Sequence, residues 1–140
     1  MQCEFPKQNA TSDEIAQILR TSKTIAVVGL SPKPDRPSHS VSRYMMDQGY
    51  QIIPVNPGQS EIFGLPCYKS VLEVPGPIDI VNIFREPAAV PEIVDQAIAK
   101  KAKTIWMQEG IVHNAAADKA RAAGLRVVMN KCLYKEHVRL

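Results

Sequence analysis

The sequence predicts an α/β fold: a doubly wound, Rossmann-like five-stranded parallel sheet with helices on both faces. Five short apolar runs recur along the 140 residues, and segments with helical patterns lie between them. This alternation of strand and helix is typical of a parallel sheet. The runs at 80–84 and 127–129 are apolar at most consecutive positions, as expected of strands that helices cover on both sides. The crossover rule then favours right-handed connections and an open sheet.

The first expected elements are a polar N-terminal arm at residues 1–11 and a short helix. Thr11 or Ser12, followed by Glu14, is typical of a helix start. Apolar residues then follow at helical spacing, namely Ile15, Ile18 and Leu19. We expect one domain that spans residues 1–140, because a chain of this length buries a single core.

The remaining elements alternate. The expected strands cover residues 24–28, 50–55, 78–84, 104–108 and 125–129, and the expected helices cover 38–48, 88–101, 114–123 and 133–138. Gly49 and Gly124 follow two of these helices in C′ positions. The segment 57–77 has no clean period, and we interpret it as a loop with one helical turn near 70–73.

Composition excludes several classes of protein. The net charge is only +3 and the basic residues are dispersed, which does not indicate a nucleic-acid binder. No apolar stretch reaches the roughly 18 residues of a membrane span, and the N-terminus lacks the pattern of a secretion signal. We therefore expect a cytoplasmic protein without a membrane partner.

Cysteine and histidine spacing argues against a metal site. Three cysteines at wide spacing fit neither a disulfide framework nor a paired-cysteine metal site, so we interpret them as reduced thiols. The three histidines show no ligand spacing with the cysteines or carboxylates. These residues are Cys3, Cys67, Cys132, His39, His113 and His137.

Candidate binding residues follow each strand, because ligands of an open parallel sheet bind beyond the carboxyl ends of its strands. After the first strand, Gly29 permits close approach, and Pro37 with Ser38 resembles a helix start whose free N–H groups suit an anion. Lys33 and Arg36 would add charge to a phosphate site. A helix cap beside a solvated basic loop is the alternative.

The pattern after the first two strands departs from the nicotinamide fingerprint. That fingerprint requires G-x-G-x-x-G and an acidic residue about twenty positions further on. Only Gly29 is present, and the second strand ends in Val55, Asn56 and Pro57 without a carboxylate. NAD(P) is therefore disfavoured and stays an alternative ligand. An ordinary turn is the alternative interpretation of Asn56 and Pro57.

The later strand ends carry charged and thiol groups. Arg85 requires an anion, which is either a ligand or a carboxylate such as Glu86 or Glu109. Trp106 is expected in the core. Cys132 is either a reactive thiolate near a helix start or a small buried residue. We assign no catalytic residue, because Glu109 has no partner acid or base at a fixed spacing.

Five segments in order resemble the stand-alone CoA-binding proteins, a family related to the nucleotide-binding part of the succinyl-CoA synthetase α subunit. The resemblance covers residues 20–138. It rests on V-V-G-L-S-P-K-P-D-R-P-S-H-S-V at 27–41, G-Y-Q-I-I-P-V-N-P at 49–57, D-I-V-N-I-F-R-E-P at 79–87, I-W-M-Q-E-G-I at 105–111 and V-M-N-K-C at 128–132. The family usually has Asp-Arg where this chain has Asn130 and Lys131, which removes a possible ion pair.

The resemblance implies a pocket for coenzyme A or an acyl-CoA across the strand ends. Its expected residues are Gly29, Leu30, Ser31, Lys33, Arg36, Ser38, Val55, Asn56, Pro57, Phe84, Arg85, Pro87, Gln108, Glu109, Gly110, Lys131 and Cys132. It favours a binding module over an enzyme. A thiol-dependent CoA carrier or enzyme that uses Cys132, and a nicotinamide or nucleotide sensor, are the alternatives. The sequence identifies no protein partner and leaves a homo-oligomer open.

Overall fold

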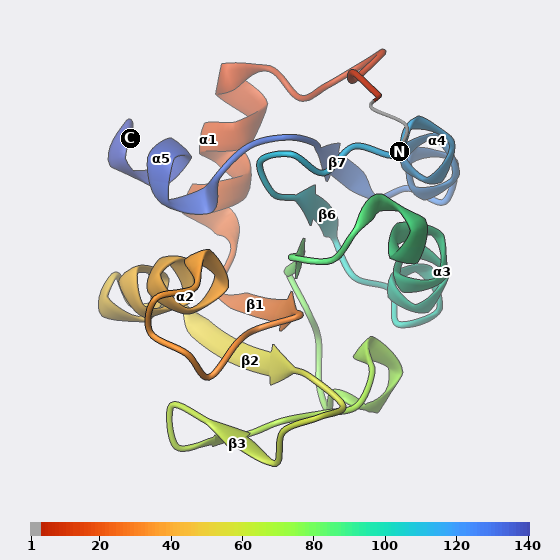
Figure 1. Cartoon of the computed structure of the whole chain (residues 1–140). Helices are drawn as coiled ribbons and strands as arrows, with labels where there is room; N and C mark the ends of the chain where they lie inside the picture. The colour runs from red at the N-terminus through yellow and green to blue at the C-terminus, as the bar shows by residue number, and fades with distance from the viewer. Residues whose placement is uncertain (1–3) are drawn as a thin grey trace.

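The computed structural model describes residues 4–140 (Figure 1). Its helices are α1 (Ser12–Thr21), α2 (Pro37–Asp47), α3 (Val90–Ala99), α4 (Asn114–Ala122) and α5 (Leu133–Val138), with 3₁₀ turns η1 (Val71–Glu73) and η2 (Pro87–Ala89). Its strands are β1 (Thr24–Val28), β2 (Gln51–Val55), β3 (Glu61–Ile62), β4 (Leu65–Pro66), β5 (Ile80–Ile83), β6 (Thr104–Met107) and β7 (Arg126–Val128).

The predicted five-stranded parallel sheet is confirmed. Its order is β2-β1-β5-β6-β7, and all four strand pairs are parallel. The chain goes from β1 to β2 on one side and then crosses to β5 on the other side of β1. The direction of winding therefore reverses between β1 and β5, which is the position where open α/β sheets place their ligands.

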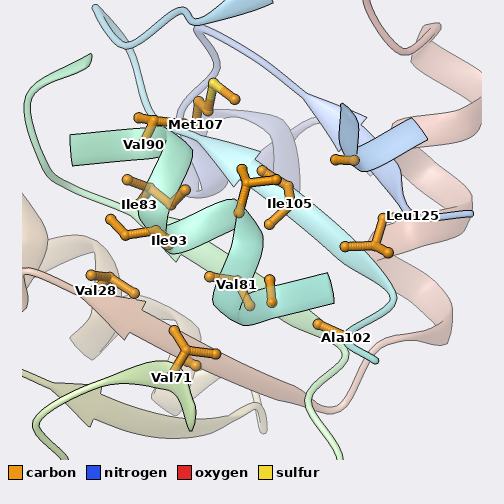
Figure 2. Packing of buried hydrophobic residues seen from close by; sticks show 14 of the residues in the cluster. Val28, Val71, Val81, Ile83, Val90, Ile93, Ala102, Ile105, Met107 and Leu125 are labelled. Atoms are coloured by element: carbon orange, nitrogen blue, oxygen red, sulfur yellow. The ribbon is translucent and has the colours of Figure 1, made fainter. Parts of the chain in front are cut away.

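Helices cover both faces of the sheet, as predicted (Figure 1). One core lies under α3, α4 and η1, and the other lies under α1, α2 and α5. In the first core, Val28 of β1 and Ile83 of β5 lie beneath Ile93 of α3 (Figure 2). The sheet therefore fixes the position of α2 on one face relative to α3 on the other.

Local signals placed most helix ends correctly. Thr11 and Glu14 form a reciprocal capping box, and Gly49 and Gly124 have the positive φ angles of C′ residues. The predicted start of α3, at residue 88, was two residues early, because Pro91 has no N–H to donate to the preceding turn. Residues 87–89 form a 3₁₀ turn there instead.

The loop prediction for residues 57–77 was incomplete. Its helical turn is confirmed as η1, but β3 and β4 form a small antiparallel hairpin that was not predicted. Phe63 and Gly64 make the two-residue turn, and both have positive φ angles. Asn-Gly or Asp-Gly is the usual signal for such a turn, so the Phe-Gly pair did not indicate a hairpin in the sequence.

The described part of the predicted arm, residues 4–11, contains no helix or strand, and it docks on the domain. Asn9 exchanges two hydrogen bonds of 2.9 Å with the backbone of Met129, just beyond β7. Glu4 accepts hydrogen bonds from the backbone and side-chain amides of Asn114 at the start of α4. None of the helices within residues 4–140 has both the length and the apolar character needed to cross a membrane.

Candidate functional site

A cavity of about 410 Å³ opens at the point where the sheet changes its direction of winding. The ends of β1, β2 and β5 contribute five residues that the sequence singled out and their neighbour Val28. The other wall is formed by α3 and by the segment before η1. The lining residues are Val28, Gly29, Val55, Asn56, Pro57, Lys69, Ser70, Arg85, Ala89, Glu92, Ile93 and Gln96.

A larger cavity, of about 530 Å³, lies at the opposite edge of the sheet. Its lining residues include Lys101, Lys103 and Arg126, at the carboxyl ends of helices and the starts of strands. Positive charge at these positions compensates the partial negative charge of the helix ends. The cations there have this structural explanation, so we favour the smaller cavity at the carboxyl edge as the functional site.

Gly29 joins three strand ends at the mouth of the smaller cavity. Its φ angle is +89°, and a Cβ at this position would lie 2.6 Å from the carbonyl oxygen of Phe84. Its N–H donates to the carbonyl of Val55 at 3.0 Å. Only glycine fits here without displacement of the backbone, because the Phe84 carbonyl takes the space that a side chain would need.

The loop after β1 is organised by Ser38. This buried side chain accepts a hydrogen bond from the backbone N–H of Ser31 at 2.9 Å, and the Ser31 hydroxyl accepts one from the N–H of Lys33 at 3.1 Å. Arg36 is the N-cap of α2 but makes no side-chain capping bond. Within residues 4–140, neither Lys33 nor Arg36 forms an ion pair, so both cations are available to an anion.

Leu30 has a different role from its loop neighbours. Its side chain is completely buried in the core under α2, so only its backbone is left for a ligand. The carbonyl of Leu30 accepts a hydrogen bond from Asn56 Nδ2 at 2.9 Å. Asn56 Oδ1 also accepts from the N–H of Gly58 at 2.8 Å, so this segment forms a turn, and Asn56 and Pro57 also line the cavity. Asn56 thereby ties the β1 and β2 ends together.

Arg85 lines the cavity and has a carboxylate partner. Its guanidinium donates to both carboxylate oxygens of Glu86, at 3.1 and 3.3 Å. These hydrogen bonds lower the pKa of Glu86. Glu109, the other carboxylate considered, instead accepts from Lys135 Nζ at 2.9 Å and raises the pKa of that lysine. Phe84 is half-buried against the core under α2, and half-buried Pro87 begins η2.

The predicted residues after β6 and β7 form a separate group outside the cavity. Gln108 is buried and donates to Asn82 Oδ1 at 2.8 Å. The backbone N–H of Gly110 donates to Asn130 Oδ1 at 2.7 Å, and this hydrogen bond links the segments after β6 and β7. Asn130 stands at φ 58°, a conformation that asparagine tolerates.

Trp106 and Cys132 are both buried. Trp106 is fully buried, as predicted, and its indole N–H donates to the carbonyl of Lys131 at 2.8 Å. Cys132 is 8% exposed and is the N-cap of α5. The interpretation as a small buried cysteine is therefore confirmed. Cys67 and Cys132 are both free thiols, and Cys3 lies outside the described residues.

Sequence analysis missed four polar residues of the cavity: Lys69, Ser70, Glu92 and Gln96. Glu92 and Gln96 are four residues apart on one face of α3, a spacing that alone does not distinguish a site from a solvated face. Lys69 and Ser70 lie in the segment interpreted as a loop. Among residues 4–140, no group of three His, Cys, Asp or Glu residues has an arrangement that would hold a metal ion.

Comparison with known proteins gives a consistent result. The CoA binding domain matches residues 23–138. An uncharacterized Bacillus subtilis protein, YneT, is 44% identical over 130 residues, which are 93% of this chain and 96% of that protein. The structure of a hypothetical protein from Pyrococcus horikoshii OT3 has a TM-score of 0.92 and 42% identity, and the match covers 100% of this chain and 99% of the other.

A longer relative matches only in part. The ADP-forming acetate-CoA ligase of Methanocaldococcus jannaschii is 28% identical over 119 residues, which are 79% of this chain but 17% of the ligase. The chain thus corresponds to a small part of that enzyme. From the match over residues 23–138 and the full-length similarity to YneT, the chain belongs to the CoA-binding domain family.

Proposed function

We propose that this protein binds coenzyme A or an acyl-CoA across the carboxyl ends of its parallel strands and serves as a binding module. The observation that carries the proposal is the cavity at the ends of β1, β2 and β5, which Gly29, Arg85 and Lys69 line together. Two cations in a cavity at the carboxyl edge of a parallel sheet suit a ligand with several phosphate groups.

The proposed path of the ligand follows the chemistry of the edge. Lys33, Arg36 and the first turn of α2 would hold the diphosphate, because a helix N-terminus and cationic side chains both favour anions. Arg85 would share its guanidinium between Glu86 and the ligand. The apolar residues Ala89 and Ile93 would contact uncharged parts of the molecule.

Membership in the CoA-binding domain family supports the proposed ligand. The ligase relative does not extend the proposal to catalysis, because this chain matches only 17% of that enzyme. A thiol-dependent mechanism finds no support in the position of Cys132, which is buried and does not line the cavity. We therefore limit the proposal to binding.

Calorimetric titration of the purified protein at fixed salt, with CoA, acetyl-CoA, dephospho-CoA, NAD, NADP and ATP, tests the proposal. We expect CoA or acetyl-CoA to bind more tightly than NAD, NADP and ATP. Thermal unfolding gives a second readout, because a ligand at a hundred times its Kd adds about 2.7 kcal/mol of stability. Preferential binding of NAD or NADP would replace the proposal with a nicotinamide site.

Two variants localise the site. Arg85→Ala removes a charge from the cavity, and Ser38→Ala removes the acceptor that orders the Ser31 amide. We expect Arg85→Ala to weaken CoA binding by about tenfold or more, since hydrogen bonds to charged groups contribute roughly 1.5–3 kcal/mol. Arg43→Ala on the exposed face of α2 and Ser12→Ala at the exposed start of α1 are the controls. Equal affinity of all four variants would remove Arg85 and Ser38 from the site.

A further inference from the structure

Lys69 brings a cation to the cavity on a segment that the fold holds in place. The preceding residue, Tyr68, donates to the carbonyl of Pro54 at 3.0 Å and accepts from the N–H of Asn56 at 2.9 Å. On the other side of Lys69, two residues after it, the N–H of Val71 donates to Gln96 Oε1 at 3.3 Å. Hydrogen bonds on both sides of Lys69 therefore hold its backbone between the end of β2 and α3.

Of the two cations in this cavity, Lys69 has no carboxylate partner within residues 4–140, whereas Arg85 has one. Arg85 already donates to both oxygens of Glu86. Lys69, by contrast, forms no ion pair within residues 4–140, although Glu92 lies on the wall of the same cavity. An exposed lysine without a carboxylate partner binds an incoming anion without first breaking an ion pair.

Lys69 and the first turn of α2 also lie on opposite faces of the sheet. The helix α2 packs on one core, whereas α3, which forms the wall near Lys69, packs on the other. Gly29 lies at the edge between them, at the end of β1, and lines the cavity. A ligand with anionic groups at two separate places would match this arrangement of cations.

Coenzyme A has anionic groups at two such places, the diphosphate bridge and a monophosphate on the adenosine ribose. We propose that Lys69 binds the ribose phosphate and thereby distinguishes coenzyme A from dephospho-CoA, while the α2 side holds the diphosphate. This inference rests on the proposed function and adds the residue that recognises the ribose phosphate of the ligand. The cavity volume of about 410 Å³ lies within the range of small-molecule sites.

The test measures the affinities of CoA and dephospho-CoA for the unmodified protein and for Lys69→Met, Lys69→Arg and Lys100→Met. Lys100 follows α3 at the end remote from the cavity, so its replacement removes the same charge elsewhere. We expect the unmodified protein to prefer CoA by about tenfold, as one charge-assisted contact allows. Lys69→Met should weaken CoA binding and leave dephospho-CoA binding unchanged, so that the two affinities become nearly equal.

Lys69→Arg should retain most of the preference because it keeps the charge, and Lys100→Met should retain all of it. Equal weakening of both ligands in Lys69→Met would assign Lys69 to another part of the ligand and overturn the inference. An unmodified protein that binds CoA and dephospho-CoA equally would overturn it too, with the proposed function intact. Failure of both ligands to bind the unmodified protein would overturn the proposed function itself.

Discussion

The Cα of Gly29 lies so close to Phe84 that a Cβ on residue 29 would be 2.6 Å from the Phe84 carbonyl oxygen. The two residues follow β1 and β5, the neighbouring strands between which the sheet changes its direction of winding. The N–H of Phe84 also donates to the carbonyl of Val28 at 2.9 Å, so the backbones are fixed against each other. The close packing of these two strand ends thus requires a glycine at position 29.

We expect Gly29→Ala to destabilise the protein by about 3 kcal/mol. A left-handed conformation costs an L-residue roughly 1–2 kcal/mol, and the contact with the Phe84 carbonyl adds strain that the rigid strand ends cannot relieve. Gly49→Ala is the matched control, because Gly49 has a φ of +97° but no atom within 4 Å of the added Cβ. Urea unfolding measures both variants, and equal losses would show that the contact with Phe84 has no energetic effect.

Much of the fold was predictable because its signals are local. The apolar runs that became β1, β2 and β5–β7 have the length and the flanking turns of buried strands, and the Thr11–Glu14 capping box marks a helix start within four residues. The open parallel sheet followed from general rules of connection. The ligand edge could be proposed for the same reason, since the carboxyl ends of parallel strands share one edge.

The parts that could not be predicted depend on contacts between distant segments. Lys69 reaches the cavity only because Tyr68 pairs with β2 and Val71 with α3. Asn82 looked like a core residue of an apolar strand, and its hydrogen bond to Gln108 links two strands. Phe63 adopts a positive φ angle although bulky residues avoid it, so no propensity could indicate the hairpin.

Asn82 and Gln108 should be coupled in stability. Asn82 is completely buried, its Oδ1 accepts from Gln108 Nε2, and its own Nδ2 has no partner within residues 4–140. We expect Asn82→Leu or Gln108→Leu alone to cost about 1–3 kcal/mol, because each leaves a polar group unpaired. The double variant should cost less than the sum, since it removes both groups.

A double-mutant cycle from urea unfolding measures this coupling. A coupling of about 1 kcal/mol or more would agree with the 2.8 Å hydrogen bond. Strict additivity would mean that the two amides do not interact in solution. Calorimetry with CoA on the same variants then tells whether the Gln108 turn contributes to binding separately from its contribution to stability.

Asp79 should make the protein less stable in acid. Burial raises the pKa of this carboxyl. Hydrogen bonds from the amides of Lys23 and Thr24, together with the nearby Lys103 ammonium, lower the pKa by a larger amount, so the net pKa lies below its ordinary value. The folded state therefore favours the ionised form. Its stabilising contribution is complete above the unfolded pKa of about 4 and is lost as the pH falls through the folded pKa.

We expect Asp79→Asn to cost about 1–2 kcal/mol at neutral pH and to flatten the dependence of stability on pH below about pH 5. Asp47→Asn is the control, because the ion pair of Asp47 with Arg43 is long, at 3.6 Å, and solvent-exposed. Urea unfolding at several pH values compares the two variants. An unchanged acid slope in Asp79→Asn would assign the acid sensitivity to other groups.

Asn9 should protect the outer edge of β7. Its side chain exchanges two hydrogen bonds with the backbone of Met129, as a neighbouring strand would. It thus covers part of an edge that has no other strand beside it within residues 4–140. We expect Asn9→Ala to speed hydrogen exchange at the Met129 amide by about tenfold, since local opening then breaks fewer bonds. Gln8→Ala is the control, because the structural contact of Gln8 uses its backbone carbonyl.

The size of the effect on global stability separates two roles of the arm. If residues 4–11 fold as one unit with the sheet, Asn9→Ala lowers the urea midpoint together with the Met129 protection. If the arm opens on its own, protection falls while the midpoint stays constant, because global unfolding then starts from an arm that is already detached. In the second case the freed edge of β7 offers unpaired backbone groups, and concentration-dependent self-association should rise in the variant but not in Gln8→Ala.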